Sequence, residues 1–277
     1  MTEPKSEKKM LSRREFGSLA LGSIATIAFS QTLLSACSTN EGVAEATPRI
    51  IGPKAAPIVR HWVLELQEIS SDLRSSSIPV RMWQEKIEAL FSRIELKDLL
   101  KDIDFETLRK RVEMPDLGVG TAPVVFPVID GLPEKTVFVK KIFGMKKGRA
   151  IVPHGHSNMA SAHLILAGGF HMRHFEKLED KGDSLLIRPT LDKNVKPGDA
   201  SSISDEKDNV HWFIAESDES YTFDVIMLDL AGKKYDIHNL DIEKAETAGN
   251  GDLRAPKIDV NKALKKYGKQ HHGEQSS

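Results

Sequence analysis

Apolar residues recur at two different periods along the chain, and the change of period separates two regions. Over residues 58–115, apolar side chains such as Val59, Trp62 and Leu66 return every three or four positions, which is the spacing of one helical face. From about residue 120 the pattern changes to short runs rich in Val, Ile and Phe, separated by Gly, Pro, Asp and Asn. Short strands at this close spacing predict a sandwich or barrel. We therefore expect a mainly β protein, with a β-barrel domain over residues 120–235 preceded by an α-helical segment.

The individual runs predict where the strands and the flanking segments lie. Strands are expected at residues 124–129, 136–143, 149–156, 162–167, 170–176, 184–188, 200–204, 210–215 and 221–230. After them, residues 236–277 are expected to form a polar C-terminal extension in which Asp259 can cap a short helix. Before the helical segment, residues 37–57 are rich in Ser, Thr, Asn, Gly, Pro and Ala and show little apolar periodicity, so they predict a tether.

The segment before the tether has the parts of an export signal. Residues 1–36 combine a basic start, an uncharged and weakly apolar stretch, and an exit of small residues. The pair Arg13 and Arg14 resembles a twin-arginine (Tat) signal, and residues 34–37 resemble a bacterial lipobox. This resemblance implies the Tat export machinery, lipidation of Cys37 and a lipid-anchored protein in the bacterial cell envelope, facing the periplasm from the outer membrane if the cell has two membranes. An uncleaved N-terminal anchor is the alternative.

Composition and missing motifs narrow the possible functions. The chain has 39 Lys and Arg against 40 Asp and Glu, a balance without the basic footprint of a nucleic-acid binder, so no nucleic acid is expected as a partner. Cys37 is the single cysteine, so neither a disulfide within the chain nor a Cys-rich zinc site can form. The sequence has no glycine-rich phosphate loop, GxSxG elbow or HExxH motif, which leaves most hydrolase and nucleotide-enzyme interpretations without support.

The residues that can carry chemistry include three histidines in the β region. His154 and His156 are two positions apart, and side chains two apart on a strand point to the same side. His211 lies on a later run and follows the Pro-Gly-Asp turn at residues 197–199. Neutral imidazole is a ligand for Fe, Ni, Cu and Zn, so these histidines are candidate metal ligands. The alternative is that they are barrel-wall histidines bonded to each other or to water.

This arrangement resembles two sequence motifs of the cupin superfamily. The first motif is a Gly, then a His-x-His pair, a Glu and a further Gly, and the second is a Pro-Gly turn followed by a His. The matching positions are Gly148, His154, His156, Gly168, Pro197, Gly198, Asp199 and His211. Ser161 stands where the motif has Glu. The resemblance implies a double-stranded β-helix, the cupin jelly-roll barrel, with a metal at its mouth.

Among cupins, the chain is most similar to three-His thiol dioxygenases of the cysteamine dioxygenase and plant cysteine oxidase type. The run from His154 to Met159 is similar to their first motif, and Asp224 falls within one residue of an outer-sphere Asp of that family. The resemblance implies a non-haem Fe(II) dioxygenase that takes O2 and a small-molecule substrate, with Asp224 as a catalytic residue. Zn, Mn and Ni stay open as alternatives for the metal. A carboxylate that is simply hydrogen-bonded is the alternative for Asp224.

Two further polar residues are expected close to the metal. Ser161 and His163 share the same strand parity, so both can face the interior of the barrel. His163 could be a fourth ligand, a side chain that supports a ligand, or a hydrogen-bonded core histidine. The second class of function is a non-catalytic cupin that binds a ligand or partner, with the helical segment as a docking or covering module. A dioxygenase should consume O2 in proportion to its product, whereas a binding protein should not.

Overall fold

The computed structural model describes residues 57–270, in which helices precede a set of antiparallel strands. The helices are α2 (Pro57–Arg74), α3 (Val80–Phe91), α4 (Leu96–Asp102) and α5 (Phe105–Arg109). The first strands are β1 (Gly120–Pro123), β2 (Val139–Lys146), β3 (Ala150–Ser157), β4 (Ala160–Ala167), β5 (Phe170–Asp180), β6 (Ser184–Val195), β7 (Ala200–Ser204), β8 (Val210–Ala215) and β9 (Glu219–Met227). The chain continues with η2 (Leu230–Gly232), β10 (Asp236–Leu240), η3 (Ile242–Lys244), β11 (Glu246–Thr247), η4 (Gly249–Gly251), β12 (Leu253–Ile258) and α6 (Val260–Tyr267). Arg13, Arg14 and Cys37 of the expected export signal lie outside the described residues.

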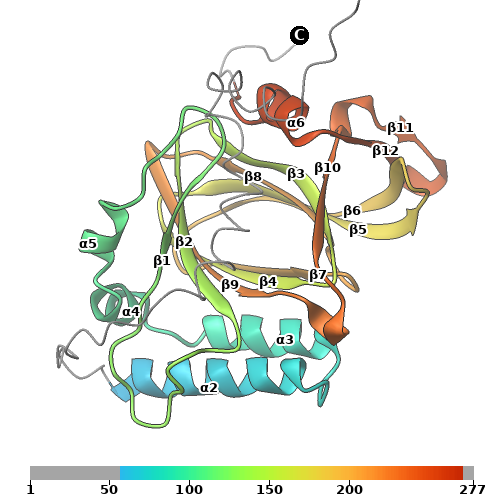
Figure 1. The fold of residues 1–277 in the computed structure, drawn as a ribbon. Coiled ribbons are helices and arrows are strands. Elements are labelled where there is room, and N and C mark those ends of the chain that lie inside the picture. Colours follow the sequence, from blue (N-terminus) through green and yellow to red (C-terminus); the bar gives the residue numbers. More distant parts are fainter. Residues whose placement is uncertain (1–56, 271–277) are drawn as a thin grey trace, which may run out of the picture. The chain divides into compact units, whose positions relative to one another are not determined.

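The strands form two sheets that enclose the barrel interior (Figure 1). The first sheet has the order β1-β2-β9-β4-β7, and the second has the order β10-β3-β8-β5-β6-β12-β11. Within them, β2-β9-β4-β7 lies opposite β3-β8-β5-β6, and successive strands alternate between the sheets except for β5 and β6, which form a hairpin in the second sheet. That order is the double Greek key of a jelly roll. The expected fold class is therefore confirmed: a mainly β, double-stranded β-helix preceded by helices.

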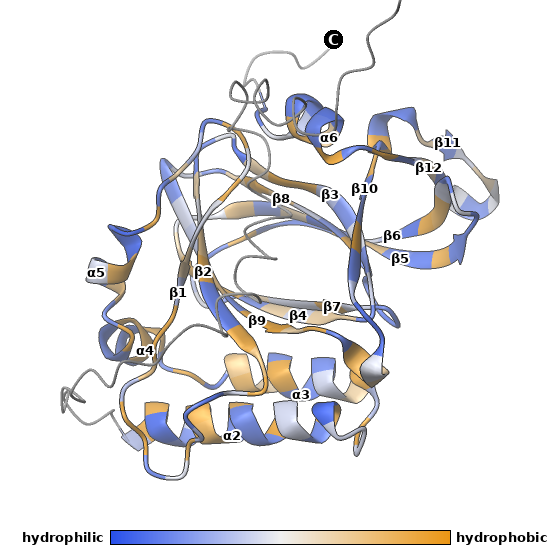
Figure 2. Ribbon diagram, viewed as in Figure 1, coloured by the Kyte–Doolittle hydropathy of each residue, from blue (hydrophilic) through white to orange (hydrophobic). Residues whose placement is uncertain are grey.

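The outer face of the first sheet packs against α2 and α3. Both helices carry apolar and polar residues along their length (Figure 2), so each can bury one face and expose the other. The apolar side chains of α2 and α3, including Trp62 and Trp83, share one core with Leu164 of β4 and Phe223 of β9. The ring of Trp62 stacks on Phe91 with centroids 5.4 Å apart, and its Nε1 donates to the Leu90 carbonyl at 3.0 Å. The helical segment is thus a cover for this sheet.

A buried polar network joins α3 to β7, the edge strand of the first sheet. Gln84 Nε2 donates to Ser202 Oγ at 3.2 Å, and Ser204 Oγ donates to Gln84 Oε1 at 2.6 Å. Ser202 Oγ in turn donates to Glu88 Oε1 at 2.6 Å. An exposed edge strand is a template for aggregation, and a covering helix removes that hazard. These bonds therefore fix α3 where the sheet needs protection.

Two parts of the β region differ from the sequence prediction. Residues 124–129, predicted as a strand, form a loop in which Val125 and Val128 are 78% and 62% exposed. Pro127 lies inside this apolar run and has no N–H for a sheet ladder, which explains the error. The predicted polar extension contains three further strands of the second sheet, because β10 pairs with β3, β12 pairs with β6, and β11 pairs with β12.

The helix α6 covers the outer face of the second sheet. Its Ala263, Leu264 and Tyr267 pack with Trp212 of β8 and with two residues of β3. Asp259 caps the helix as expected, with its carboxylate accepting from the Asn261 N–H at 2.9 Å. Among residues 57–270, no helix is both long enough and apolar enough to cross a membrane.

Candidate metal centre

Strand register brings the three candidate ligands to one place in the barrel. β3 carries His154 and His156, and β8, its neighbour in the second sheet, carries His211. His154 is the direct cross-strand partner of His211, after an irregularity in the pairing that begins at Ile151. Directly paired residues on neighbouring strands present their side chains on the same face of the sheet. The two-residue spacing then turns His156 to that face as well.

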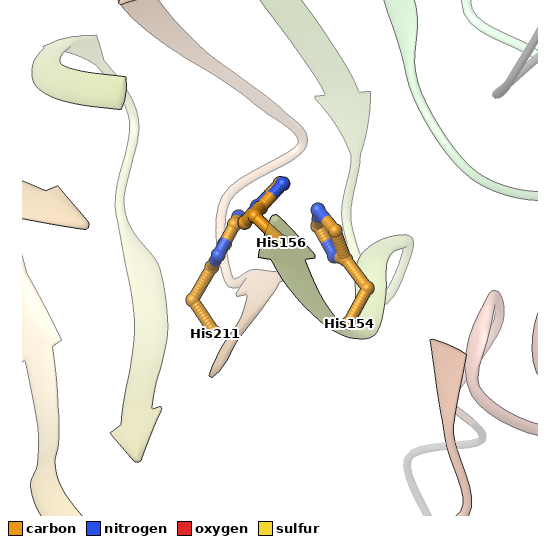
Figure 3. Close-up of side chains that lie close together, drawn as sticks. All are labelled: His154, His156 and His211. Atoms are coloured by element: carbon orange, nitrogen blue, oxygen red, sulfur yellow. The ribbon is translucent and has the colours of Figure 1, made fainter. Parts of the chain in front are cut away.

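The three imidazoles converge inside the barrel (Figure 3). One nitrogen from each ring lies within 4.8 Å of the others. The ring centroids are 4.2 Å apart for His154 and His211, 4.7 Å for His154 and His156, and 5.1 Å for His156 and His211. All three residues are at most 3% exposed. Three nitrogen donors at this spacing could surround one metal ion.

Burial keeps the three rings in the neutral form that binds metal. It lowers the pKa of His154 to about 4, and it lowers the pKa of His156 and His211 well below the usual value. For His156 and His211 the neighbouring histidines lower the pKa further, because two positive charges this close repel each other. A neutral imidazole carries a lone pair on one of its nitrogens. The group therefore offers three lone pairs at neutral pH.

The hydrogen bonds around these rings leave nitrogens for a metal to bind. His154 Nδ1 lies 2.8 Å from the carbonyl oxygen of Val152. A carbonyl only accepts, so Nδ1 holds the proton and Nε2 holds the lone pair. His156 has no hydrogen-bond partner at either ring nitrogen, and His211 has none at Nδ1. Buried polar atoms without partners are rare, and a bound ion would satisfy them. The donor set thus fits a divalent metal that accepts imidazole, such as iron or zinc.

A buried amide that sequence reasoning missed holds the backbone of His156. Asn209 Nδ2 donates to the His156 carbonyl at 2.9 Å, and Asn209 Oδ1 accepts from the His156 N–H at 3.3 Å. Gly155 permits this approach, because a Cβ at that position would lie 2.8 Å from Asn209 Oδ1. Asn209 comes just before β8, and an Asn at such a position is typical of a turn. The position of Asn209 in the sequence therefore did not indicate that it holds the backbone of His156.

The first sheet presents polar residues to the same interior. Ser161 and His163 of β4 are each 3% exposed, and Ser161 Oγ and His163 Nε2 have no hydrogen-bond partner. The ring of His163 lies 5.4 Å from that of His211 but is not part of the converging group. His163 Nδ1 lies 2.7 Å from Asp224 Oδ2, and Thr222 Oγ1 donates to Asp224 Oδ1 at 2.5 Å. Asp224 therefore supports His163, and its catalytic role stays a prediction.

A further imidazole extends the row on the second sheet. His174 of β5 is the direct cross-strand partner of His211, and its ring centroid lies 6.3 Å from that of His211. It is 1% exposed, and its Nε2 has no hydrogen-bond partner. Burial lowers the pKa of His174 to about 3. The barrel interior is thus a polar chamber that contains further buried polar side chains besides the three converging histidines.

The fold and the site together define a jelly roll, or double-stranded β-helix, with a three-histidine group that could bind a metal ion. No protein-family model and no curated protein matches the sequence. Among solved structures, the chain is similar to procruciferin, an 11S globulin from Brassica napus, with 14% identity, 38% of this chain and 23% of that chain covered, and a TM-score of 0.29. A cupin superfamily protein from Desulfitobacterium hafniense matches with 11% identity, 44% and 88% coverage, and a TM-score of 0.29. A protein with a double-stranded β-helix domain from Klebsiella pneumoniae matches with 12% identity, 47% and 92% coverage, and a TM-score of 0.31. Likenesses this distant carry no functional argument, and the fold assignment rests on the strand order.

Proposed function

We propose that the protein is a non-haem metal-dependent dioxygenase with iron(II) held by His154, His156 and His211. The observation that carries this proposal is the convergence of three buried, neutral imidazoles on one point of the barrel. Ser161 stands where many cupins have a carboxylate ligand, so the protein ligands would be three nitrogens. When bound, an iron(II) ion with three protein ligands supplies open coordination positions for a substrate and for O2.

The chain's own residues would prepare this chamber for a small substrate. Burial of the three ligands keeps bulk water away from the metal and strengthens the electrostatic interactions inside. Asp224 and Thr222 fix the ring of His163, which leaves its Nε2 free to bond a substrate atom. Ser161 Oγ offers a second such group on the same strand. That the substrate is a thiol is supported by the sequence resemblance alone.

Iron also fits the proposed route of export. Affinity of an imidazole site for divalent metals rises from manganese and iron towards copper, so iron(II) would lose to copper or zinc in a compartment with mixed metals. A Tat signal implies export after folding, so the cytoplasm can load the metal first. The pair Arg13 and Arg14 supports this route.

We further propose that Cys37 anchors the exported protein to a membrane through lipid. Cys37→Ser should abolish lipidation, because the chain has no other thiol. Radiolabelled palmitate fed to cells should label the natural protein and leave the variant unlabelled. Label that still entered the variant would overturn the lipid anchor and leave the metal site untouched.

The activity can be tested on protein exported by its own pathway. Metal content per chain is measured first, and O2 uptake is then followed with a panel of small thiols, with His154→Ala as the inactive control. We expect bound iron, and O2 consumed in proportion to oxidised product. Iron-loaded protein that consumed no O2 with any thiol would contradict the thiol dioxygenase. Protein without metal would favour the non-catalytic ligand-binding cupin.

A further inference from the structure

The strand β10 places one more polar side chain in the chamber. β10 pairs with β3 on one side and with β12 on the other, and its register with β3 pairs Asn239 with His154 and Ile237 with His156. Directly paired residues share a face of the sheet, with Cβ atoms about 4.5–5.5 Å apart. Asn239 therefore points to the same side as the imidazole of His154, into the barrel.

The neighbouring residue on β10 confirms this orientation. His238 pairs with Gly155, and a Cβ on Gly155 would lie 2.8 Å from His238 Nε2 and 3.1 Å from a methyl group of Val210. Val210 belongs to the apolar cluster on the outer side of the second sheet, together with Leu240 of β10. His238 and Leu240 thus face outward, and Asn239, between them, faces inward.

The side-chain nitrogen of Asn239 is buried and makes no hydrogen bond within the fold. The residue is 6% exposed, and its Nδ2 has no hydrogen-bond partner. An amide nitrogen can only donate. Leaving a buried donor unpaired is unfavourable, so such groups call for a partner that the protein itself does not supply. A molecule bound beside His154 would be within reach of this donor.

We propose that Asn239 selects the ligand of the metal centre by donating a hydrogen bond to it. The proposal rests on the proposed metal site. Asn239 favours small ligands that bind the metal through an anionic atom and present an acceptor to the amide. A donor aimed at an anion in a water-poor chamber acts more strongly than the same donor in water. Asn239 is thus a specificity-determining residue contributed by a strand outside the eight-stranded jelly roll.

Azide binding to the cobalt(II)-loaded protein tests this role without relying on activity. Azide is a small anion, and its binding changes the visible spectrum of protein-bound cobalt(II). Natural protein is compared with Asn239→Ala and with Asn239→Leu, both of which remove the donor without adding a charge. His238→Asn is the matched control, because it alters the outward-facing neighbour on the same strand.

We expect all four proteins to bind cobalt, and the two Asn239 variants to bind azide about ten- to a hundredfold more weakly, the size of a hydrogen bond to a charged group. The His238→Asn control should bind azide as the natural protein does. Equal azide affinity in the natural protein and the Asn239 variants would overturn the role of Asn239 and leave the metal site standing. Natural protein that bound no cobalt would overturn the metal site itself, and this inference with it. If Asn239→Leu does not fold, the comparison is made with Asn239→Ala alone.

Discussion

The two faces of the first sheet are both buried, but they differ in chemistry. On the outer face, towards α2 and α3, β4 presents Leu164 to an apolar core, and the amide of Gln84 is paired with serine hydroxyls. On the inner face, the same strand presents Ser161 and His163, whose Oγ and Nε2 are unpaired. Other buried side chains around the interior also carry unpaired atoms, namely His156, His174, Ser201, His211 and Asn239.

This difference separates residues that stabilise the fold from residues that await a bound group. A buried polar atom without a partner costs about 1–3 kcal/mol, so a cluster of such atoms around one interior marks a place where a bound group can satisfy them. Single unpaired atoms also occur elsewhere, at Trp212 Nε1 and His238 Nε2 on the other face of the second sheet. Apolar burial under the helices provides the stability, at roughly 25 cal/mol for each Å² removed from water. We therefore expect substitutions in the cover to change stability alone, and substitutions in the interior to change metal and ligand binding.

The largest effect is expected from removing a ligand on the inner side. His211→Ala should empty the metal site, because loss of even a residue that supports a ligand costs about 10–100-fold in metal affinity. The measurement is metal per chain by mass spectrometry, at a free metal concentration that half-saturates the natural protein. His171→Ala is the control, since His171 lies on β5 with a partly exposed side chain that contacts Asp192. Full metal content in His211→Ala would remove it from the ligand set.

The next effect is expected on the outer side. Trp83 is fully buried beneath the first sheet, and Trp83→Ala should lower the free energy of unfolding by about 3–5 kcal/mol through the cavity it leaves. Urea unfolding of the metal-free protein measures this loss. The fraction that stays folded should bind metal with the affinity of the natural protein. If affinity fell together with stability, the cover and the interior would be coupled, and the division between them would be wrong.

The fold and the three converging histidines could be predicted because both depend on local patterns. The change from helical to strand periodicity is visible within short windows, and His154 and His156 need only strand geometry to share a face. His211 follows a turn motif at a recognisable spacing. The run at Val125 misled the prediction because an apolar stretch near prolines satisfies a strand pattern without being able to pair.

The residues that complete the chamber could not be predicted, because they depend on register between distant strands. Asn239 reaches the chamber only because β10 pairs with β3 and brings Asn239 beside His154. Asn209 reaches His156 only because a glycine between the two ligands leaves room for its amide. Neither arrangement leaves a periodic trace in the sequence, since one buried polar residue in a polar segment resembles its exposed neighbours.

A smaller effect of the interior should appear in the dependence of stability on pH. Burial lowers the pKa of His174 to about 3, although the Asp208 carboxylate lies 4.0 Å from its Nδ1. An unfolded chain protonates this histidine near pH 6.5, so below that pH the unfolded state takes up the proton first. Stability of the metal-free protein should therefore fall as pH drops from about 6.5 towards 3, by up to about 1.4 kcal/mol per pH unit for this residue.

His174→Leu should make this decline shallower, and urea unfolding at several pH values measures it. His61→Leu is the control, because the side chain of His61 is 81% exposed and should leave the slope unchanged. If the free energy of unfolding changed equally with pH in the natural protein and in His174→Leu, the interior would accommodate a protonated His174. Water would then enter the chamber although its side chains are buried.

The smallest effect is expected for His163, which lies in the chamber but outside the converging group. His163→Ala should reduce metal affinity by less than about tenfold, because the hydrogen bond of His163 goes to Asp224 and not to a ligand, and its ring only lies beside those of His211 and Phe213. Competition with a chelator of known affinity measures the change, and Asp224→Asn, which weakens the support of His163, should give an effect no larger. If His163→Ala emptied the site as His211→Ala does, His163 would be a fourth ligand held by Asp224. The inner face of the first sheet would then bind the metal itself rather than only face it.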